Sequence, residues 1–191
     1  RHSPRNRFVA RTLNHAGIAT LLFDLLTVEE EAQDAAGRFR FDIDLLADRL
    51  IIVTDWVQEV PERQVLNLGY FGASTGAAAA LVAAAERPGI VRAVVSRGGR
   101  PALALGALDR VVAPTRLVVG GEDREVLALN QQARLRLKRS DLVVVQGATH
   151  LFQEPGALEQ AAALAVEWFT RHLVNASHER SDRPEGPVSA S

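Results

Sequence analysis

The segment 65–85, VLNLGYFGASTGAAAALVAAA, constrains the fold of this chain more than any other part of it. An apolar run over 65–71 meets the glycine-rich stretch GASTG at 72–76 and continues as an alanine-rich stretch without glycine or proline. This pattern predicts a buried strand, a very tight turn and a helix. A serine on such a turn sits in strained backbone geometry, and small residues two positions before and after it let the strand and helix pass each other.

Ser74 is therefore the candidate nucleophile, with Gly72 and Gly76 as the two small neighbours. Two other interpretations of the turn are a glycine-rich connection chosen for close packing and a loop that cradles phosphate. A P-loop would carry a lysine followed by serine or threonine after its last glycine, whereas Ala77 and Ala78 stand there. Because the strand and the helix that a nucleophile turn requires are both present, we favour the nucleophile.

The rest of the chain alternates between helical and strand patterns. We expect helices at about 5–16, 41–59, 77–86, 102–110, 124–138 and 156–173, and strands at 18–23, 65–71, 90–96, 115–119 and 141–146. Strands that read as continuous apolar runs, each separated by a helix, predict a mostly parallel, doubly wound α/β sheet with helices on both faces. We expect one domain over 1–174 and a disordered tail over 175–191, which is polar and contains proline and glycine.

Two further chemical groups follow strands of this predicted sheet. Asp123 comes after the strand 115–119, and His150 comes after the strand 141–146. A serine nucleophile needs a base, and the imidazole needs a carboxylate to fix its tautomer. Because ligands bind at the carboxyl ends of parallel strands, these residues are expected to meet Ser74 there. The alternatives are an exposed loop histidine, helix capping by Asp123, and Glu122 as the acid.

Three segments in this order resemble a known family. FGASTG, VGGEDREV and GATHLFQEPGALE are similar to the α/β-hydrolase fold, and within it to the dienelactone-hydrolase-like branch, over residues 1 to about 173. The resemblance implies an ester or related acyl hydrolase in which Ser74 attacks, His150 is general base and then acid, and Asp123 orients His150. The backbone N–H of Thr75 would be one oxyanion donor. Dienelactone hydrolases proper use a cysteine where this chain has Ser74.

The resemblance also predicts that the chain is N-terminally incomplete. It opens on Arg1 without a methionine, and the family's strand before the first helix would lie between 18–23 and 65–71. We expect that strand, the second oxyanion donor and a fused or associated domain upstream of residue 1. Without the missing strand, 18–23 and 65–71 should not pair directly.

Composition and charge exclude several classes of binding partner. Lys and Arg total 22 against 23 Asp and Glu, so the chain has no excess of positive charge that would attract nucleic acid. No apolar run reaches the roughly 18 residues that span a bilayer, and no secretion signal is evident, so we expect a cytoplasmic protein without membrane contact. Cysteine is absent, which excludes disulfides and thiolate metal sites, and we expect no cofactor or metal.

The substrate is a small-molecule acyl compound on this interpretation. Arg97 and Arg100 lie in SRGGRP after a strand, where they could meet a substrate carboxylate or could simply be solvated. A charged loop is expected at 28–39, and its acidic part from Glu29 to Asp34 could belong to a short lid or be ordinary solvated surface. No long insertion separates 90–96 from 115–119, which predicts an open site for small, soluble substrates.

Two alternative functions remain. One is a non-catalytic binding module, and the other is an acyltransferase or perhydrolase that uses the same three residues.

Overall fold

Runs of valine, leucine and alanine form the strands, because a parallel sheet covered on both faces has no side that must be polar. The structure, a computed structural model, describes residues 2–174 of the chain. Four strands pair in parallel, in the order β1-β2-β3-β4. Their bounds are β1 Leu68–Ala73, β2 Val91–Arg97, β3 Thr115–Gly120 and β4 Ser140–Val145.

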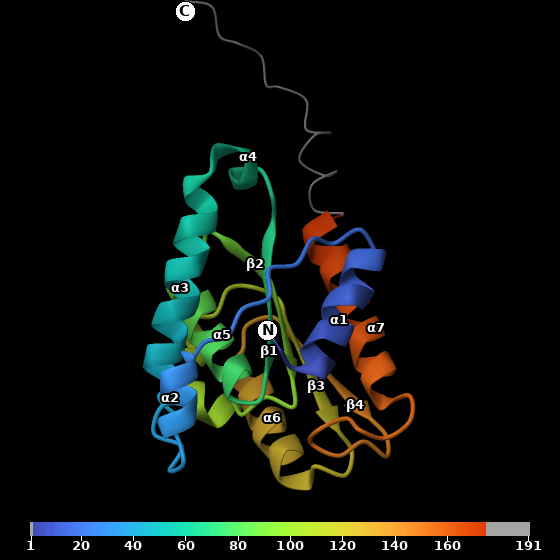
Figure 1. The fold of residues 1–191 in the computed structure, drawn as a ribbon. Coiled ribbons are helices and arrows are strands. Elements are labelled where there is room, and N and C mark those ends of the chain that lie inside the picture. The colour runs from blue at the N-terminus through green and yellow to red at the C-terminus, as the bar shows by residue number, and fades with distance from the viewer. Residues whose placement is uncertain (1, 175–191) are drawn as a thin grey trace, which may run out of the picture.

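Helices cover both faces of the sheet, as Figure 1 shows, with α1 and α7 on one side and α3 and α5 on the other. The doubly wound α/β class is therefore confirmed. The α-helices are α1 Pro4–His15, α2 Val28–Gln33, α3 Ile43–Glu59, α4 Pro61–Gln64, α5 Thr75–Glu86, α6 Arg124–Arg136 and α7 Ala157–Phe169. Two 3-10 turns, η1 Pro101–Ala104 and η2 Leu108–Arg110, replace the short helix expected near 102–110, and a π-turn, η3 Thr170–Val174, extends α7.

The two faces are packed differently. Helix α5 buries a run of alanines against β1, β2 and helix α3, so small side chains allow this helix to lie close to the sheet. The opposite face uses larger side chains, among them Phe152, Trp168 and Phe169, to pack α1 and α7 onto β2, β3 and β4. Close packing beneath α5 fixes the end of β1, where Ser74 lies.

The expected strand at 18–23 is wrong. Residues 18–23 have no regular secondary structure, although they are apolar. An apolar run becomes a strand only where a neighbouring strand completes its hydrogen-bond ladder. Within the described residues β1 pairs with β2 alone and is an edge of the sheet, so 18–23 and β1 do not pair, as expected.

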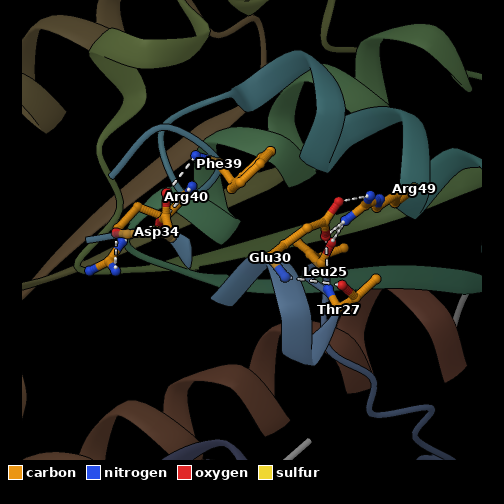
Figure 2. A network of polar contacts seen from close by, with 7 residues as sticks. All are labelled: Leu25, Thr27, Glu30, Asp34, Phe39, Arg40 and Arg49. Carbon is orange, nitrogen blue, oxygen red and sulfur yellow. Dashed lines mark hydrogen bonds and ion pairs between the residues drawn. The ribbon is translucent and has the colours of Figure 1, made fainter. Parts of the chain in front are cut away.

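The charged segment at 28–39 is also more ordered than the expected loop. It contains α2, which begins with a capping box: the Thr27 hydroxyl accepts from the Glu30 N–H, and the Glu30 carboxylate accepts from the Thr27 N–H. Figure 2 shows the same carboxylate paired with the Arg49 guanidinium of α3, at 2.5 Å and 2.6 Å. A buried Asp34 carboxylate accepts from Arg40 in the turn that follows. The Glu30–Arg49 pair ties α2 to α3, and the Asp34–Arg40 bond lies in the turn before α3.

The other predicted helices and strands differ from the observed ones by a few residues at their ends. Strand β1 begins at Leu68, and Val65 and Leu66 are exposed in the turn that follows α4. The predicted tail, 175–191, lies outside the described residues. Across residues 2–174, none of the helices combines the length and the apolar character needed to cross a membrane.

Candidate active site

Ser74 follows directly on β1 and has a backbone conformation that few L-residues adopt, with φ 53° and ψ −120°. Its N–H donates to the carbonyl oxygen of Arg97, at 3.2 Å. A Cβ on Gly72 would lie 2.5 Å from the Cα of Ala77, so this glycine is required. A Cβ on Gly76 would meet nothing within 4 Å, so a small residue with a Cβ would fit there, and of the two positions only Gly72 must be glycine.

The Ser74 side chain is not used by its own helix. Ser74 is the N-cap residue of α5, a position where a serine hydroxyl usually accepts from a first-turn N–H, yet it makes no capping hydrogen bond. The N–H of Thr75 belongs to the first turn, whose amides lack partners within the helix. Hydroxyl and amide are therefore both available at the carboxyl end of β1.

His150 and Asp123 are joined by a hydrogen bond. The distance from His150 Nδ1 to Asp123 Oδ2 is 2.7 Å. Asp123 is the N-cap residue of α6, and its side chain makes no capping hydrogen bond. The carboxylate is thus directed to the imidazole rather than to the helix, and the neighbouring Glu122 is exposed.

Backbone contacts hold these two loops against each other. The Glu122 N–H donates to the carbonyl oxygen of Ala148, at 3.0 Å. A Cβ on Gly120 would clash with the same oxygen, so glycine permits the close approach. The Thr149 N–H and hydroxyl both donate to the Glu154 carboxylate, at 3.1 Å and 2.5 Å, and these bonds lower the pKa of Glu154. The position of His150 is therefore set by the loops on either side of it.

One cavity joins the candidate residues. Ser74, His150 and Arg97 line a cavity of about 180 Å³, at the carboxyl ends of the strands as expected. Register explains the presence of Arg97, because Ala73 at the end of β1 lies opposite it in β2. Arg100 is exposed and does not line this cavity, and only its backbone N–H faces the site, donating to the Ser74 carbonyl oxygen at 3.4 Å.

A buried amide fixes the loop that follows β2. Asn130 on α6 donates to the carbonyl oxygen of Gly99, at 2.9 Å. A Cβ on Gly98 would lie 3.6 Å from Cε1 of His150, so this loop packs against the imidazole. Sequence reasoning did not single out Asn130, because a polar residue within a helix carries no local sign of a distant partner.

Sequence reasoning also missed the contribution of α1. Ser3, Arg5 and Asn6 line the cavity, from the N-cap and first turn of that helix. A usable signal was present: a serine followed by proline predicts a helix start. Helices that run antiparallel to the strands begin at the carboxyl edge of a parallel sheet.

Among residues 2–174 no cluster of three or more His, Cys, Asp or Glu side chains could hold a metal ion.

Proteins of known sequence and structure are similar to this chain. A protein of Mycobacterium tuberculosis named "Putative phosphoribosyl transferase Rv0571c" is 61% identical over 174 residues, which are 91% of this chain and 39% of that protein. The chain thus spans about two fifths of that relative's length. The crystal structure of a dienelactone hydrolase from Anabaena variabilis has 58% identity and a TM-score of 0.87, covering 90% of this chain and 81% of that one.

More distant structures share the fold alone. Est1E from Butyrivibrio proteoclasticus has 16% identity and a TM-score of 0.73, covering 89% of this chain and 82% of that one. The family model of dienelactone hydrolases matches residues 5–175, which include the serine turn, the acid loop and the histidine loop. The chain belongs to the dienelactone hydrolase family, and it has an α/β-hydrolase fold.

Proposed function

We propose that this chain is a serine hydrolase that cleaves small esters or related acyl compounds through an acyl-enzyme. The observation that carries the proposal is that His150, paired with Asp123, lines the same cavity as Ser74, whose backbone is strained and whose hydroxyl does not cap its helix. Strain of this kind persists where the surrounding structure holds it, and it is concentrated at functional sites.

The chemistry follows from the hydrogen-bond roles. A carboxylate only accepts, so the bond to Asp123 places the proton of neutral His150 on Nδ1 and leaves Nε2 free to accept. Nε2 takes the Ser74 proton as Oγ attacks the acyl carbon, and the Thr75 N–H stabilises the oxyanion. The C–O bond then breaks, and His150 protonates the departing alcohol. In the second stage His150 takes a proton from water as the water attacks the acyl-enzyme, and it returns that proton to Ser74 Oγ as the carboxylic acid is released.

Turnover of an activated ester tests this proposal. With p-nitrophenyl acetate we expect a burst of one p-nitrophenolate per protein molecule, because acylation is faster than deacylation for a good leaving group. Ser74→Ala should abolish the burst. No hydrolysis by the folded protein would favour a binding module instead. The name of the M. tuberculosis relative describes a transferase, so phosphoribosyl transfer is to be assayed in parallel.

A further inference from the structure

The loop that joins β2 to η1, residues 97–100, contacts the candidate nucleophile through its backbone. The Ser74 N–H donates to the carbonyl oxygen of Arg97, at 3.2 Å, and the Ser74 carbonyl oxygen accepts from the Arg100 N–H, at 3.4 Å. The 97–100 loop therefore holds Ser74 on its amide side and on its carbonyl side, in the strained conformation with φ 53°. A shift of this loop would move the backbone that carries the Ser74 hydroxyl.

The same loop lies against the imidazole of His150. A Cβ built on Gly98 would lie 3.6 Å from Cε1 of His150 and 3.3 Å from the His150 carbonyl oxygen. Gly98 has φ 51°, a conformation that favours glycine, so the turn brings backbone rather than a side chain to the ring. Cε1 is the ring atom between Nδ1 and Nε2. The 97–100 loop thus borders the imidazole next to the nitrogen that would accept the Ser74 proton.

Two hydrogen bonds from other elements fix the 97–100 loop. The Gly98 N–H donates to the carbonyl oxygen of Val118 in β3, at 2.7 Å. The Gly99 carbonyl oxygen accepts from Nδ2 of Asn130 in α6, at 2.9 Å. Of these two bonds, only the one from Asn130 comes from a side chain, so a substitution can remove it.

Asn130 is buried, with 0% exposure, and its amide serves two carbonyl groups. Nδ2 donates to the Val126 carbonyl oxygen of the same helix, at 2.8 Å, as well as to Gly99. Because both partners are acceptors, the donor end of the amide must face them. Oδ1 is buried without a hydrogen-bond partner among the described residues, which is unfavourable. Complete hydrogen bonding therefore does not explain an amide at this position, whereas the bond to the 97–100 loop does.

Helix α6 reaches His150 from two sides. Asp123 is the N-cap residue of α6, and Asn130 follows about two turns further along, so the two lie on the same face of the helix. At one side of the ring Asp123 Oδ2 lies 2.7 Å from Nδ1. At the other side the loop that Asn130 holds lies against Cε1. One rigid helix can thus set the direction of the imidazole.

We infer that Asn130 is a positioning residue for the hydrolysis at Ser74, because its bond to Gly99 holds the loop that sets the Ser74 backbone and the His150 ring. The inference rests on the proposed function and adds a residue to it. Asn130 is not among the residues that line the cavity, so its effect on the reaction is indirect. Such support matters, since a displacement of about 1 Å can lower a rate on the order of 100-fold.

Two substitutions separate the two hydrogen bonds of Asn130. Asn130→Leu keeps the branching of the side chain and removes both bonds. Asn130→Ser retains a hydroxyl that can donate to the Val126 carbonyl oxygen and is too short to reach Gly99. With p-nitrophenyl acetate we expect each variant to lower kcat about 10- to 100-fold, with KM changed by less than about threefold. Asn130→Ser also covers the case in which the leucine variant does not fold.

Thr54→Val is the matched control. Thr54 is a buried polar residue of α3, and its hydroxyl is also hydrogen-bonded to the carbonyl oxygen four residues earlier, that of Leu50, at 2.8 Å. Its second partner is the Tyr70 hydroxyl of β1, at 2.7 Å, and neither Thr54 nor Tyr70 lines the cavity. We expect Thr54→Val to lower the midpoint of a urea melt, as the Asn130 variants do, and to leave kcat unchanged.

A second readout does not depend on turnover. The chain contains five histidines, so its imidazole Hε1 signals in an NMR spectrum are few, and His150→Gln assigns the signal of His150. We expect a nuclear Overhauser contact between the Gly98 Hα protons and His150 Hε1 in the native protein and in Thr54→Val. The contact should be lost in both Asn130 variants.

The two readouts together decide the inference. It is wrong if kcat and the Gly98–His150 contact both persist in a folded Asn130 variant. It is also wrong if kcat falls with the contact intact, because Asn130 would then act by another route. Loss of the contact in a protein whose native form does not hydrolyse esters would overturn the proposed function alone, whereas native hydrolysis with an unchanged kcat in the Asn130 variants would overturn only this inference.

Discussion

The helix starts that carry the candidate catalytic residues Ser74 and Asp123 differ from other helix starts in how they use the same residue types, and Ser3 of α1, which lines the cavity, caps its helix in the ordinary way. At α2 and α3, Thr27 and Asp42 are N-cap residues, and each side chain accepts from a first-turn N–H. At α5 and α6, Ser74 and Asp123 are also N-cap residues, and neither makes such a bond. A missing cap of this kind costs about 0.5–2 kcal/mol of stability.

The difference supports the roles proposed for Ser74 and Asp123 without reference to any relative. A hydroxyl and a carboxylate in positions that favour capping are instead directed to a cavity and to His150. Proteins tolerate such local losses mainly at functional sites, where the side chain is needed elsewhere. Substitution at the two kinds of helix start should therefore separate activity from stability.

The largest effect is expected at Ser74. Ser74→Ala should lower kcat for an activated ester by at least about 10⁴-fold, because the nucleophile is removed. The free energy of unfolding should change by less than about 0.5 kcal/mol, because no capping bond is lost. Steady-state kinetics and a urea melt give both values. A large loss of stability would mean that Ser74 has a capping role after all.

Asp123 should come next. Asp123→Asn should lower kcat by roughly 10⁴-fold, since an amide can impose the wrong tautomer on His150. Glu122→Gln is the matched control, one residue away and exposed, and its effect should be small. If the two variants rank in the opposite order, the acid is Glu122.

A cap distant from the site should show the reverse pattern. Asp42→Ala removes an acceptor that lies 3.0 Å from the Leu45 N–H, and it should reduce the free energy of unfolding by about 1 kcal/mol. The kcat should stay unchanged. Asp48→Ala, exposed in the middle of the same helix, is the control for the loss of a charge. A fall in kcat with Asp42→Ala would remove the distinction between the two kinds of helix start.

The smallest effect concerns the capping box of α2. Hydrogen bonds from Arg49 and then from the Thr27 N–H lower the pKa of Glu30 from 4.5 to about 2. Because the folded-state pKa is the lower one, the stabilisation is present above pH 4.5 and is lost as the pH falls toward 2. Glu30→Gln should flatten the stability profile in this window. An unchanged slope in urea melts between these pH values would show that the pair contributes nothing.

The sequence predicts the elements near the site well and those at the edge of the sheet less well. The segment at 65–85 combines a strand, a turn and a helix whose signals are local, and β1 and α5 are found there within a few residues. The apolar run at 18–23 has the same local signal as a strand. Its state depends on a neighbour that pairs with it, which no local pattern encodes.

The candidate site shows the same contrast between features with a local sequence signal and features that depend on distant packing. Ser74, Asp123 and His150 each stand three or four residues after a predicted strand, and topology alone brings them to one edge. The contact between Asp123 and His150 depends on the approach of two loops at Gly120, and the sequence could not choose between Asp123 and Glu122. Arg5 and Asn130 reach the site from helices, so their roles depend on packing that only the structure provides.

Covalent labelling tests the central claim most directly. The purified protein is treated with a fluorophosphonate, and the modified residue is located by intact-protein mass and peptide mapping. We expect one adduct per molecule, on Ser74, and none in Ser74→Ala, because only a serine activated by His150 should react at a useful rate. Labelling that persists in Ser74→Ala, or a protein that is folded and does not react, would contradict the assignment of Ser74 as the nucleophile.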